Sequence, residues 1–285
     1  MITLKSQREI EQMKKSCKIL TDIHRHLREM IQPGLDMWEI EEYVRSVCKE
    51  KNVIPLQIGV DGAYMDYPYA TCCSLNDEVA HSFPRHYILK EGELLKVDMV
   101  LGLIEDDYAD MTKVDFDNVK EMKKLMENFR GGVADSCWAY PVGQVSKEVE
   151  DLMDVTRECL YRGIAEAKVG NRLGDIGYAI QSYAEDLGYG VVRDLCGHGV
   201  GPTMHEAPLV PHFGQKGKGL RLKEGMVLTI EPMINIGGWE ILEEEDSGWG
   251  FKTIDGSFSC QMEHQFVVTK DGPIILTSQG EEGSY

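Results

Sequence analysis

Apolar residues recur every three or four positions between residues 10 and 27, which predicts an amphipathic helix. Ser6 and Glu9 form a capping box at its start, in which each side chain bonds to the backbone of the other residue. A second box, Asp36 with Glu39, starts another amphipathic stretch. The chain is therefore expected to open with two helices.

The same order of elements is written a second time. Ser146 caps a long helical pattern, and a further amphipathic stretch follows it. Residues 89–98 match residues 222–231, because each segment begins with LKEG and ends on a carboxylate, Asp98 or Glu231. Two helices followed by strands, written twice, predict an α+β domain with an internal two-fold axis. Such an axis would bring the two carboxylates to the centre.

We expect residues 1–285 to form a single catalytic domain built from two halves, about 1–135 and about 142–285. Neither a low-complexity linker nor a third repeat divides the chain. A charged segment at about 105–130 interrupts the first half, and its pattern over 118–129 predicts a helix that begins with its own capping box. This segment is interpreted as a surface insert.

The net charge argues against polyanionic partners. The chain carries 48 acidic and 30 basic residues, a formal charge of −18, which would repel nucleic acid and anionic lipid. Its start lacks the apolar core of a signal peptide, and no later stretch is long and apolar enough for a membrane span. Eight cysteines without a C-x-x-C pair fit reduced thiols. A cytoplasmic protein that binds neither DNA nor membrane is expected.

Three carboxylates stand in nearly continuous apolar runs that suit buried strands. Asp98 lies in a strand expected at 94–103, Glu231 in the run 227–233, and Glu263 near the start of a strand expected at 260–268. A buried carboxylate without a partner is costly, and a metal, an arginine or backbone hydrogen bonds can each stabilise it. For one acid alone these alternatives stay open. Three such acids without matching buried arginines indicate a divalent cation.

His198 lies between glycines in the sequence GHGVG, at 197–201, where the backbone can approach other groups closely. A single histidine in such a loop is more often structural than a ligand. With the carboxylates, however, it completes a hard, oxygen-rich donor set that suits Mn, Fe, Co or Zn in pairs. Two such ions would bridge a water, lower its pKa and position it to attack a carbonyl. The chemistry indicated is hydrolysis.

At this point the motifs become recognisable as a set. The Asp98 strand, GHGVG, HEAP at 205–208, TIEP at 229–232 and QMEH at 261–264 resemble type I methionine aminopeptidases over essentially the whole chain. The resemblance implies the pita-bread fold, a central antiparallel sheet flanked by helices with internal pseudo-two-fold symmetry. It places the five metal ligands on Asp98, Asp135, His198, Glu231 and Glu263.

The resemblance also assigns roles around the metals. A metal-bridging hydroxide is expected to attack the first peptide bond of a nascent protein while Glu231 shuttles the proton. His81 and His205 match two histidines that hold the substrate and stabilise the tetrahedral intermediate. The pocket for the methionine side chain falls on Tyr64, Tyr67, Cys72 and Trp249, whose rings and sulfur suit a flexible thioether.

The chain departs from the family pattern between its two aspartates. Asp98 and Asp135 are 37 residues apart, whereas the family usually joins them by a short hairpin. Asp110 lies at about the conventional distance and competes for the ligand role. We favour Asp135, because Ser136 and then the Ser146 helix cap reproduce the family's sequence after its second ligand.

Two alternatives remain at this stage. One is a proline-specific exopeptidase on the same fold, a class that normally carries a further N-terminal domain. The other is a metal-free pita-bread binding module. Only 26 residues separate His205 from Glu231, too few for the helical insertion of type II enzymes.

Partners follow from the resemblance and from charge. The expected substrate is the N-terminal methionine of nascent polypeptides, and a monomer is expected. The basic segment 216–223 suggests a weak anchor on the ribosome surface, although a solvated loop explains it as well.

Overall fold

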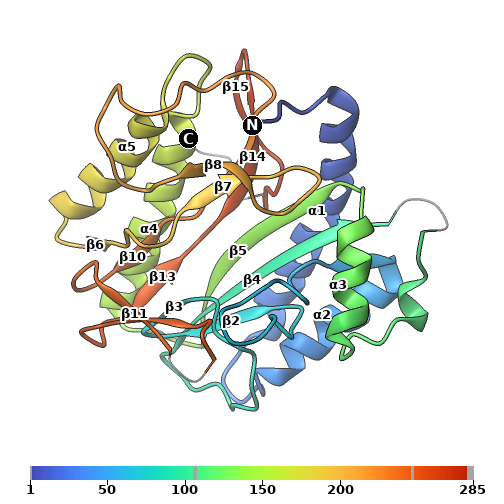
Figure 1. Ribbon diagram of the computed structural model, residues 1–285. Coiled ribbons are helices and arrows are strands. Elements are labelled where there is room, and N and C mark those ends of the chain that lie inside the picture. The colour runs from blue at the N-terminus through green and yellow to red at the C-terminus, as the bar shows by residue number, and fades with distance from the viewer. Residues whose placement is uncertain (1, 105–107, 245–246, 281–285) are drawn as a thin grey trace.

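The computed structural model describes residues 2–104, 108–244 and 247–280. In these residues, helices pack against several small antiparallel sheets, as predicted for the α+β class (Figure 1). The helices are α1 (Gln7–Met30), α2 (Trp38–Lys51), α3 (Val119–Asn128), α4 (Lys147–Ala165) and α5 (Leu173–Asp186), with a 3-10 turn η1 (Met111–Lys113).

Most helices begin where the polar residues predict. In α1, the Ser6 hydroxyl accepts from the backbone of Glu9, whose side chain accepts from the Ser6 amide at 2.7 Å. Ser146 caps α4. The second box differs from expectation. The Asp36 side chain accepts from the Trp38 amide at 3.2 Å, but Met37 occupies the cap position, so α2 begins one residue later than the box suggests.

One sheet is organised around a long central strand. Strand β4 pairs antiparallel with all three other strands, and its bounds coincide with the predicted strand at 94–103. The strands are β1 (Val53–Pro55), β2 (Cys72–Leu75), β4 (Leu94–Leu103) and β5 (Val133–Pro141).

A five-stranded sheet belongs to the second part of the chain, in the order β15-β14-β9-β7-β8. Its strands are β7 (Gly197–Gly199), β8 (Glu206–Val210), β9 (Val227–Ile230), β14 (His264–Thr269) and β15 (Gly272–Ile275). Two three-stranded sheets complete the fold, β13-β10-β6 and β11-β12-β3. They contain β3 (Glu78–Ala80), β6 (Gly190–Val191), β10 (Met233–Asn235), β11 (Ile241–Glu243), β12 (Phe251–Thr253) and β13 (Ser259–Gln261).

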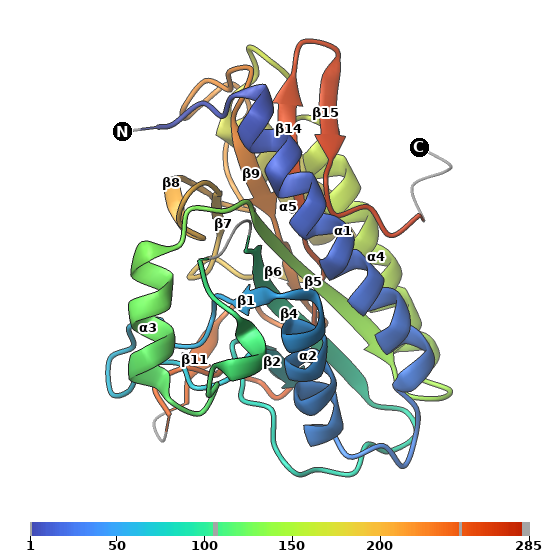
Figure 2. The same ribbon diagram turned by 90° about the vertical axis from the view of Figure 1, so that its right-hand side faces the viewer.

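Helices α1 and α4 cover one side of the sheets. Helix α1 packs on β4 and β5, and α4 packs on β9, β10 and β13. Both run along the same side of the strands, while β7 and β8 lie on the other side (Figure 2). Helices α1 and α2 precede β4 as α4 and α5 precede β9. From this repeated order we propose one domain with halves at about 1–135 and 142–285.

The apolar run 260–268, expected as a single strand, forms two strands in different sheets. Strand β13 pairs with β10, and β14 pairs with β9 and β15. Between them, the Glu263 amide donates to the carbonyl of Cys137 on β5 at 2.8 Å. An apolar run does not show where a chain passes from one sheet to the next, so the pattern could not reveal this crossing.

The insert forms the predicted surface helix. In α3, capped by Asn118, only Met122 is fully buried. Lys123 on α3 forms ion pairs with Asp61 and Asp66, the second at 3.2 Å. Residues 105–107 of the insert lie outside the described residues.

None of the described helices combines the length and the apolar character that a membrane span requires.

Candidate metal centre

Strand register brings the first two carboxylates together. On the paired strands β4 and β5, Asp98 lies opposite Cys137 and Asp135 lies opposite Val100. Because side chains alternate between the two faces of a strand, Asp98 and Asp135 lie on the same face, diagonal to each other. The lengthened connection between the strands does not disturb this register, since pairing runs without a break from Leu94 to Gly102.

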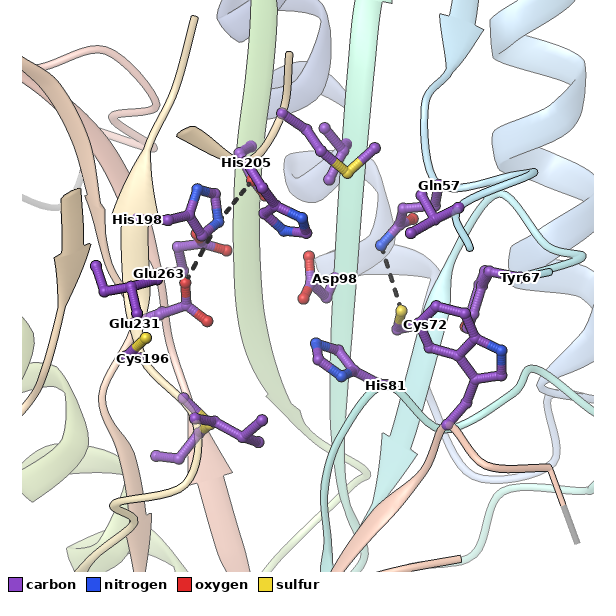
Figure 3. A pocket seen from close by; sticks show the side chains of 18 of the residues that line it. Gln57, Tyr67, Cys72, His81, Asp98, Cys196, His198, His205, Glu231 and Glu263 are labelled. Carbon is purple, nitrogen blue, oxygen red and sulfur yellow. Dashed lines mark hydrogen bonds and ion pairs between the residues drawn. The ribbon is translucent and has the colours of Figure 1, made fainter. Parts of the chain in front are cut away.

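The second part of the chain supplies the other three groups. His198 lies on β7, Glu231 follows β9, and Glu263 lies at the crossing between β13 and β14. His198 Nε2 is 3.4 Å from Asp135 Oδ2 and 3.6 Å from Glu231 Oε1. Donor atoms of Asp135, His198 and Glu263 all lie within 4.8 Å of one another. Figure 3 shows His198, Glu231 and Glu263 together on one side of the cavity, with Asp98 facing them.

Neighbouring groups fix the orientation of His198. Its Nδ1 lies 3.0 Å from the Gly199 carbonyl, which can only accept, so Nδ1 carries the proton and Nε2 faces the carboxylates with its lone pair. The flanking glycines are required here, because a Cβ on Gly197 would overlap the Thr229 carbonyl. Burial lowers the pKa of His198 to about 3, so the imidazole is neutral at physiological pH.

Glu231 is held at both oxygens. Thr229 Oγ1 donates to Oε1 at 3.1 Å, and Gln261 Nε2 donates to Oε2 at 3.3 Å. Its backbone amide donates to His212 Nε2 at 3.1 Å. The carboxylate is therefore oriented by groups from β9 and β13 before any ligand arrives.

The carboxylates lack cationic protein partners. Burial raises the pKa of Asp98 to about 7. Burial, and then repulsion from neighbouring carboxylates, raises the pKa of Asp135 and of Glu263 well above the usual range. Burial and the charge of Asp98 also raise the pKa of Glu231. Among the described residues, no lysine or arginine forms an ion pair with any of these four acids.

The donor set fits divalent metal ions. Asp98 Oδ1 and Glu263 Oε1 are buried acceptors without a hydrogen-bond partner among the described residues. Glu263 belongs to the cluster with Asp135 and His198, and Asp98 lines the same cavity beside it. Unsatisfied buried carboxylate oxygens are costly unless a cation neutralises them. Four acids and one neutral imidazole suit Mn, Fe, Co or Zn better than a thiolate zinc centre.

A cavity of about 500 Å³ opens beside this cluster. On its far side, Tyr67 and Trp249 meet edge to face with ring centroids 5.0 Å apart. The Tyr67 hydroxyl donates to the Thr71 carbonyl at 2.9 Å, so the ring presents an apolar face. Cys72 accepts from Gln57 Nε2 at 3.3 Å (Figure 3). The cavity thus connects a pocket lined by aromatic rings and a cysteine sulfur to the carboxylate cluster.

Two further histidines reach the cavity. The ring of His205 meets that of His198 edge to face at 4.4 Å, and the ring of His81 lies 6.5 Å from Trp249. His81 has a positive φ of 61°, a strained backbone that turns its side chain into the cavity directly after β3. Burial lowers the pKa of His81 to about 4 and also lowers that of the partly open His205. Each offers a neutral N–H donor.

Comparison with known proteins identifies this arrangement. The model of metallopeptidase family M24 matches residues 11–270. The chain belongs to family M24. It is 39% identical to methionine aminopeptidase A of Synechocystis sp. over 97% of each chain, and 35% identical to methionine aminopeptidase 1 of Bacillus subtilis over 97% of this chain and 99% of that one.

Solved structures of M24 peptidases agree. A methionine aminopeptidase from Streptococci is 68% identical, covers 100% of both chains and superposes with a TM-score of 0.92. The enzyme from Thermotoga maritima is 36% identical, with a TM-score of 0.83 over 98% of this chain and 100% of that one. A prolidase from Pyrococcus horikoshii shares the fold at 19% identity and a TM-score of 0.68, but this chain covers 64% of it. The pita-bread fold is confirmed.

The structure separates the two competing aspartates of this M24 peptidase. Asp135 is buried in the cluster. Asp110 instead caps the turn η1, accepts from the Thr112 amide at 3.1 Å and pairs with Lys113 at 2.9 Å. Its side chain is 47% exposed. The insert therefore extends the connection between β4 and β5 and leaves Asp135 in register.

One predicted pocket residue lies elsewhere. Tyr64 is 76% exposed and is not among the residues that line the cavity, so the structure does not bring it together with Tyr67, Cys72 and Trp249. Its ring packs over Gly248 instead. The reason is local: the chain turns outward after Val60, and only Tyr67 returns inward, donating its amide to the Val60 carbonyl at 2.9 Å.

Other lining residues were not predicted. Val100 and Met233 lie two positions after Asp98 and Glu231, so strand alternation could have found them. Gln57, Cys196 and Met204 come from irregular segments, where no periodicity marks them.

Proposed function

We propose that this chain is a methionyl aminopeptidase that hydrolyses the first peptide bond of polypeptides beginning with methionine. The observation that carries the proposal is the cavity itself, in which a pocket of Tyr67, Cys72 and Trp249 adjoins the carboxylate cluster. A methionine side chain in that pocket would place the following carbonyl beside the cluster. Full-length likeness to proteins named methionine aminopeptidases supports it.

The cluster would hold two divalent ions, Co, Mn, Fe or Zn. The ligands are Asp98, Asp135, His198, Glu231 and Glu263. Bound ions would supply Lewis acidity and lower the pKa of a water at neutral pH. Availability in the cell, rather than this donor set, decides which metal is used.

The protein groups supply orientation and proton transfer. Neutral His81 and His205 would donate N–H groups to the substrate, His205 to the carbonyl oxygen on which negative charge develops. Glu231, whose oxygens are already oriented by Thr229 and Gln261, would carry the proton to the leaving amine. The rings of the pocket exclude water from the first side chain.

A proline-specific exopeptidase is not favoured, because the likeness to prolidase is confined to the fold. A metal-free binding module is not favoured either, since the oxygens of Asp98 and Glu263 would stay unsatisfied.

One experiment separates these functions. Purified protein supplied with Mn²⁺ or Co²⁺ should release free methionine from a Met-Ala-Ser peptide, and a chelator should stop the release. Cleavage of Ala-Pro peptides instead would indicate a proline-specific enzyme. A protein that cleaves neither and retains no metal would be a binding module. His198→Ala and Glu263→Ala should both fold and be inactive.

The protein would act in the cytoplasm, in agreement with its eight unpaired cysteines. Segment 216–223 would anchor it weakly on ribosomal RNA. Lys216, Lys218 and Arg221 in that segment are exposed, and the backbone is fixed by Arg172, whose guanidinium donates to the Gly219 carbonyl at 2.7 Å.

A further inference from the structure

A buried lysine lies beside the turn that carries His205. Lys5 precedes α1, and its side chain is only 3% exposed. Its ammonium lies 2.6 Å from Glu206 Oε2, and the same oxygen accepts from Thr3 Oγ1 at 2.7 Å. Lysine is almost never fully buried unless it is paired. Glu206 follows His205 directly and lines the cavity.

The segment around Lys5 is also held by its backbone. The Lys5 amide donates to the Gly225 carbonyl at 2.7 Å, in the turn that leads into β9 and Glu231. In Figure 2 this segment runs into α1 past β8 and β9. The backbone of Lys5 is therefore bonded to the turn before β9, and its side chain is bonded to Glu206.

The Glu206 side chain packs against the turn that carries His205. Its carboxylate lies against Gly201, so closely that a Cβ on Gly201 would overlap it. Within the turn, the Gly201 amide donates to the Thr203 carbonyl at 3.0 Å, and Thr203 Oγ1 donates to the His205 carbonyl at 3.2 Å. The paired strands β7 and β8 fix the backbone at both ends of this turn, with Gly199 opposite Glu206. The Lys5–Glu206 pair additionally holds the Glu206 side chain at the second end.

We propose that Lys5 is a positioning residue for His205 and acts through Glu206. The inference rests on the proposed function, in which His205 contacts the substrate. Without Lys5, the Glu206 carboxylate would lose its cation in a cavity lined by five other carboxylates, those of Asp98, Asp135, Asp194, Glu231 and Glu263, and repulsion would move it toward solvent. His205, the adjacent residue, would then leave its edge-to-face contact with His198.

Lys5→Met tests the proposal, because methionine keeps an unbranched side chain and removes the charge. We expect kcat for Met-Ala-Ser to fall on the order of tenfold with little change in KM, as for a misplaced transition-state donor. Lys14→Met is the matched control, since Lys14 is a lysine of α1 whose side chain is 42% exposed and pairs with Glu11 at 2.8 Å. It should retain wild-type kcat.

A double-variant cycle distinguishes positioning from general destabilisation. In a His205→Ala background, Lys5→Met should lower the remaining turnover no further, because the group that it positions is absent. An equal fold-loss in both backgrounds, or unchanged kcat in Lys5→Met, would overturn the proposal. If Lys5→Met does not fold, Thr3→Val removes the second donor to Glu206 and should cause a smaller loss of the same kind.

A spectroscopic readout keeps the test independent of activity. In metal-free protein, the imidazole signal of His205, assigned by its loss in His205→Ala, should shift or broaden in Lys5→Met and not in Lys14→Met. An unchanged signal would refute the positioning role even if the wild type were inactive. A wild type without methionine release would refute the proposed function alone.

Discussion

Replacing Asp135 by asparagine perturbs the cluster with almost no change in volume. In the metal-free protein, burial and the charges of Asp98 and Glu231 raise the pKa of the Asp135 carboxyl, so its ionised form is unfavourable in the folded state at neutral pH. The neutral amide removes that repulsion. The metal-free variant should therefore be at least as stable as the metal-free wild type at pH 8.

The stabilisation of Asp135→Asn by added metal, in contrast, should be smaller than that of the wild type. Metal at about 100 times its dissociation constant stabilises the wild type by about 2.7 kcal/mol, which corresponds to a rise in Tm of about 4–5 °C for a chain of 285 residues. Loss of even an outer partner of a ligand costs about 10–100-fold in affinity, so loss of Asp135 itself should abolish most of that rise. Turnover should fall by at least about 100-fold.

Asp110→Asn is the internal control. Its side chain is 47% exposed and pairs with Lys113 on the surface, so its effect on stability should stay within about 1 kcal/mol and its metal response should match the wild type. Thermal scans with and without Mn²⁺, together with methionine release, measure both variants. A lost metal response in Asp110→Asn, with a normal one in Asp135→Asn, would refute the ligand assignment.

Three further results are expected. Burial lowers the pKa of His24 from 6.5 to about 3, so the contribution of neutral His24 to folding stability is fully present above pH 6.5 and is lost as pH falls. In urea unfolding of chelated protein, the wild type should therefore lose about 2 kcal/mol more than His24→Asn between pH 7 and pH 5. Equal losses would contradict this. Trp249→Ala should lower kcat/KM for Met-Ala-Ser on the order of tenfold and admit bulkier first residues, whereas unchanged selectivity would remove Trp249 from the pocket. Charge reversal at Lys216, Lys218 and Arg221 should weaken ribosome co-sedimentation at low salt without slowing peptide cleavage; unaltered co-sedimentation would dismiss the anchor.

Local signals in the sequence were sufficient where one periodicity or one cap decides the structure. The β4 strand at 94–103 follows from a nearly continuous apolar run, and the starts of α1 and α4 follow from hydroxyl side chains that cap them. The α+β class followed because the same order of elements is repeated. These features depend on contacts between residues close in sequence, which a single chain displays directly.

Features that depend on how segments meet in space were harder to predict. The apolar run 260–268 gives no sign that it crosses between sheets at Glu263, because buried strands in either sheet need the same residues. Tyr64 and Tyr67 have the same chemistry, and only the turn after Val60 decides which ring faces inward. Nothing near Lys5 in the sequence signals its burial, because its partner Glu206 lies 201 positions away.

The cluster explains why fold and metal must be considered together. Its acids are placed by strand register and its histidine by flanking glycines, so the fold itself brings the negative charges together. In the metal-free protein this arrangement opposes folding increasingly as pH rises through the raised carboxyl pKa values, about 7 for Asp98. A divalent cation reverses the sign of that contribution. Rigid strands that hold the acids in place without a cation also keep the site ready for one, and much of the affinity for metal then comes from relief of repulsion already present in the folded chain.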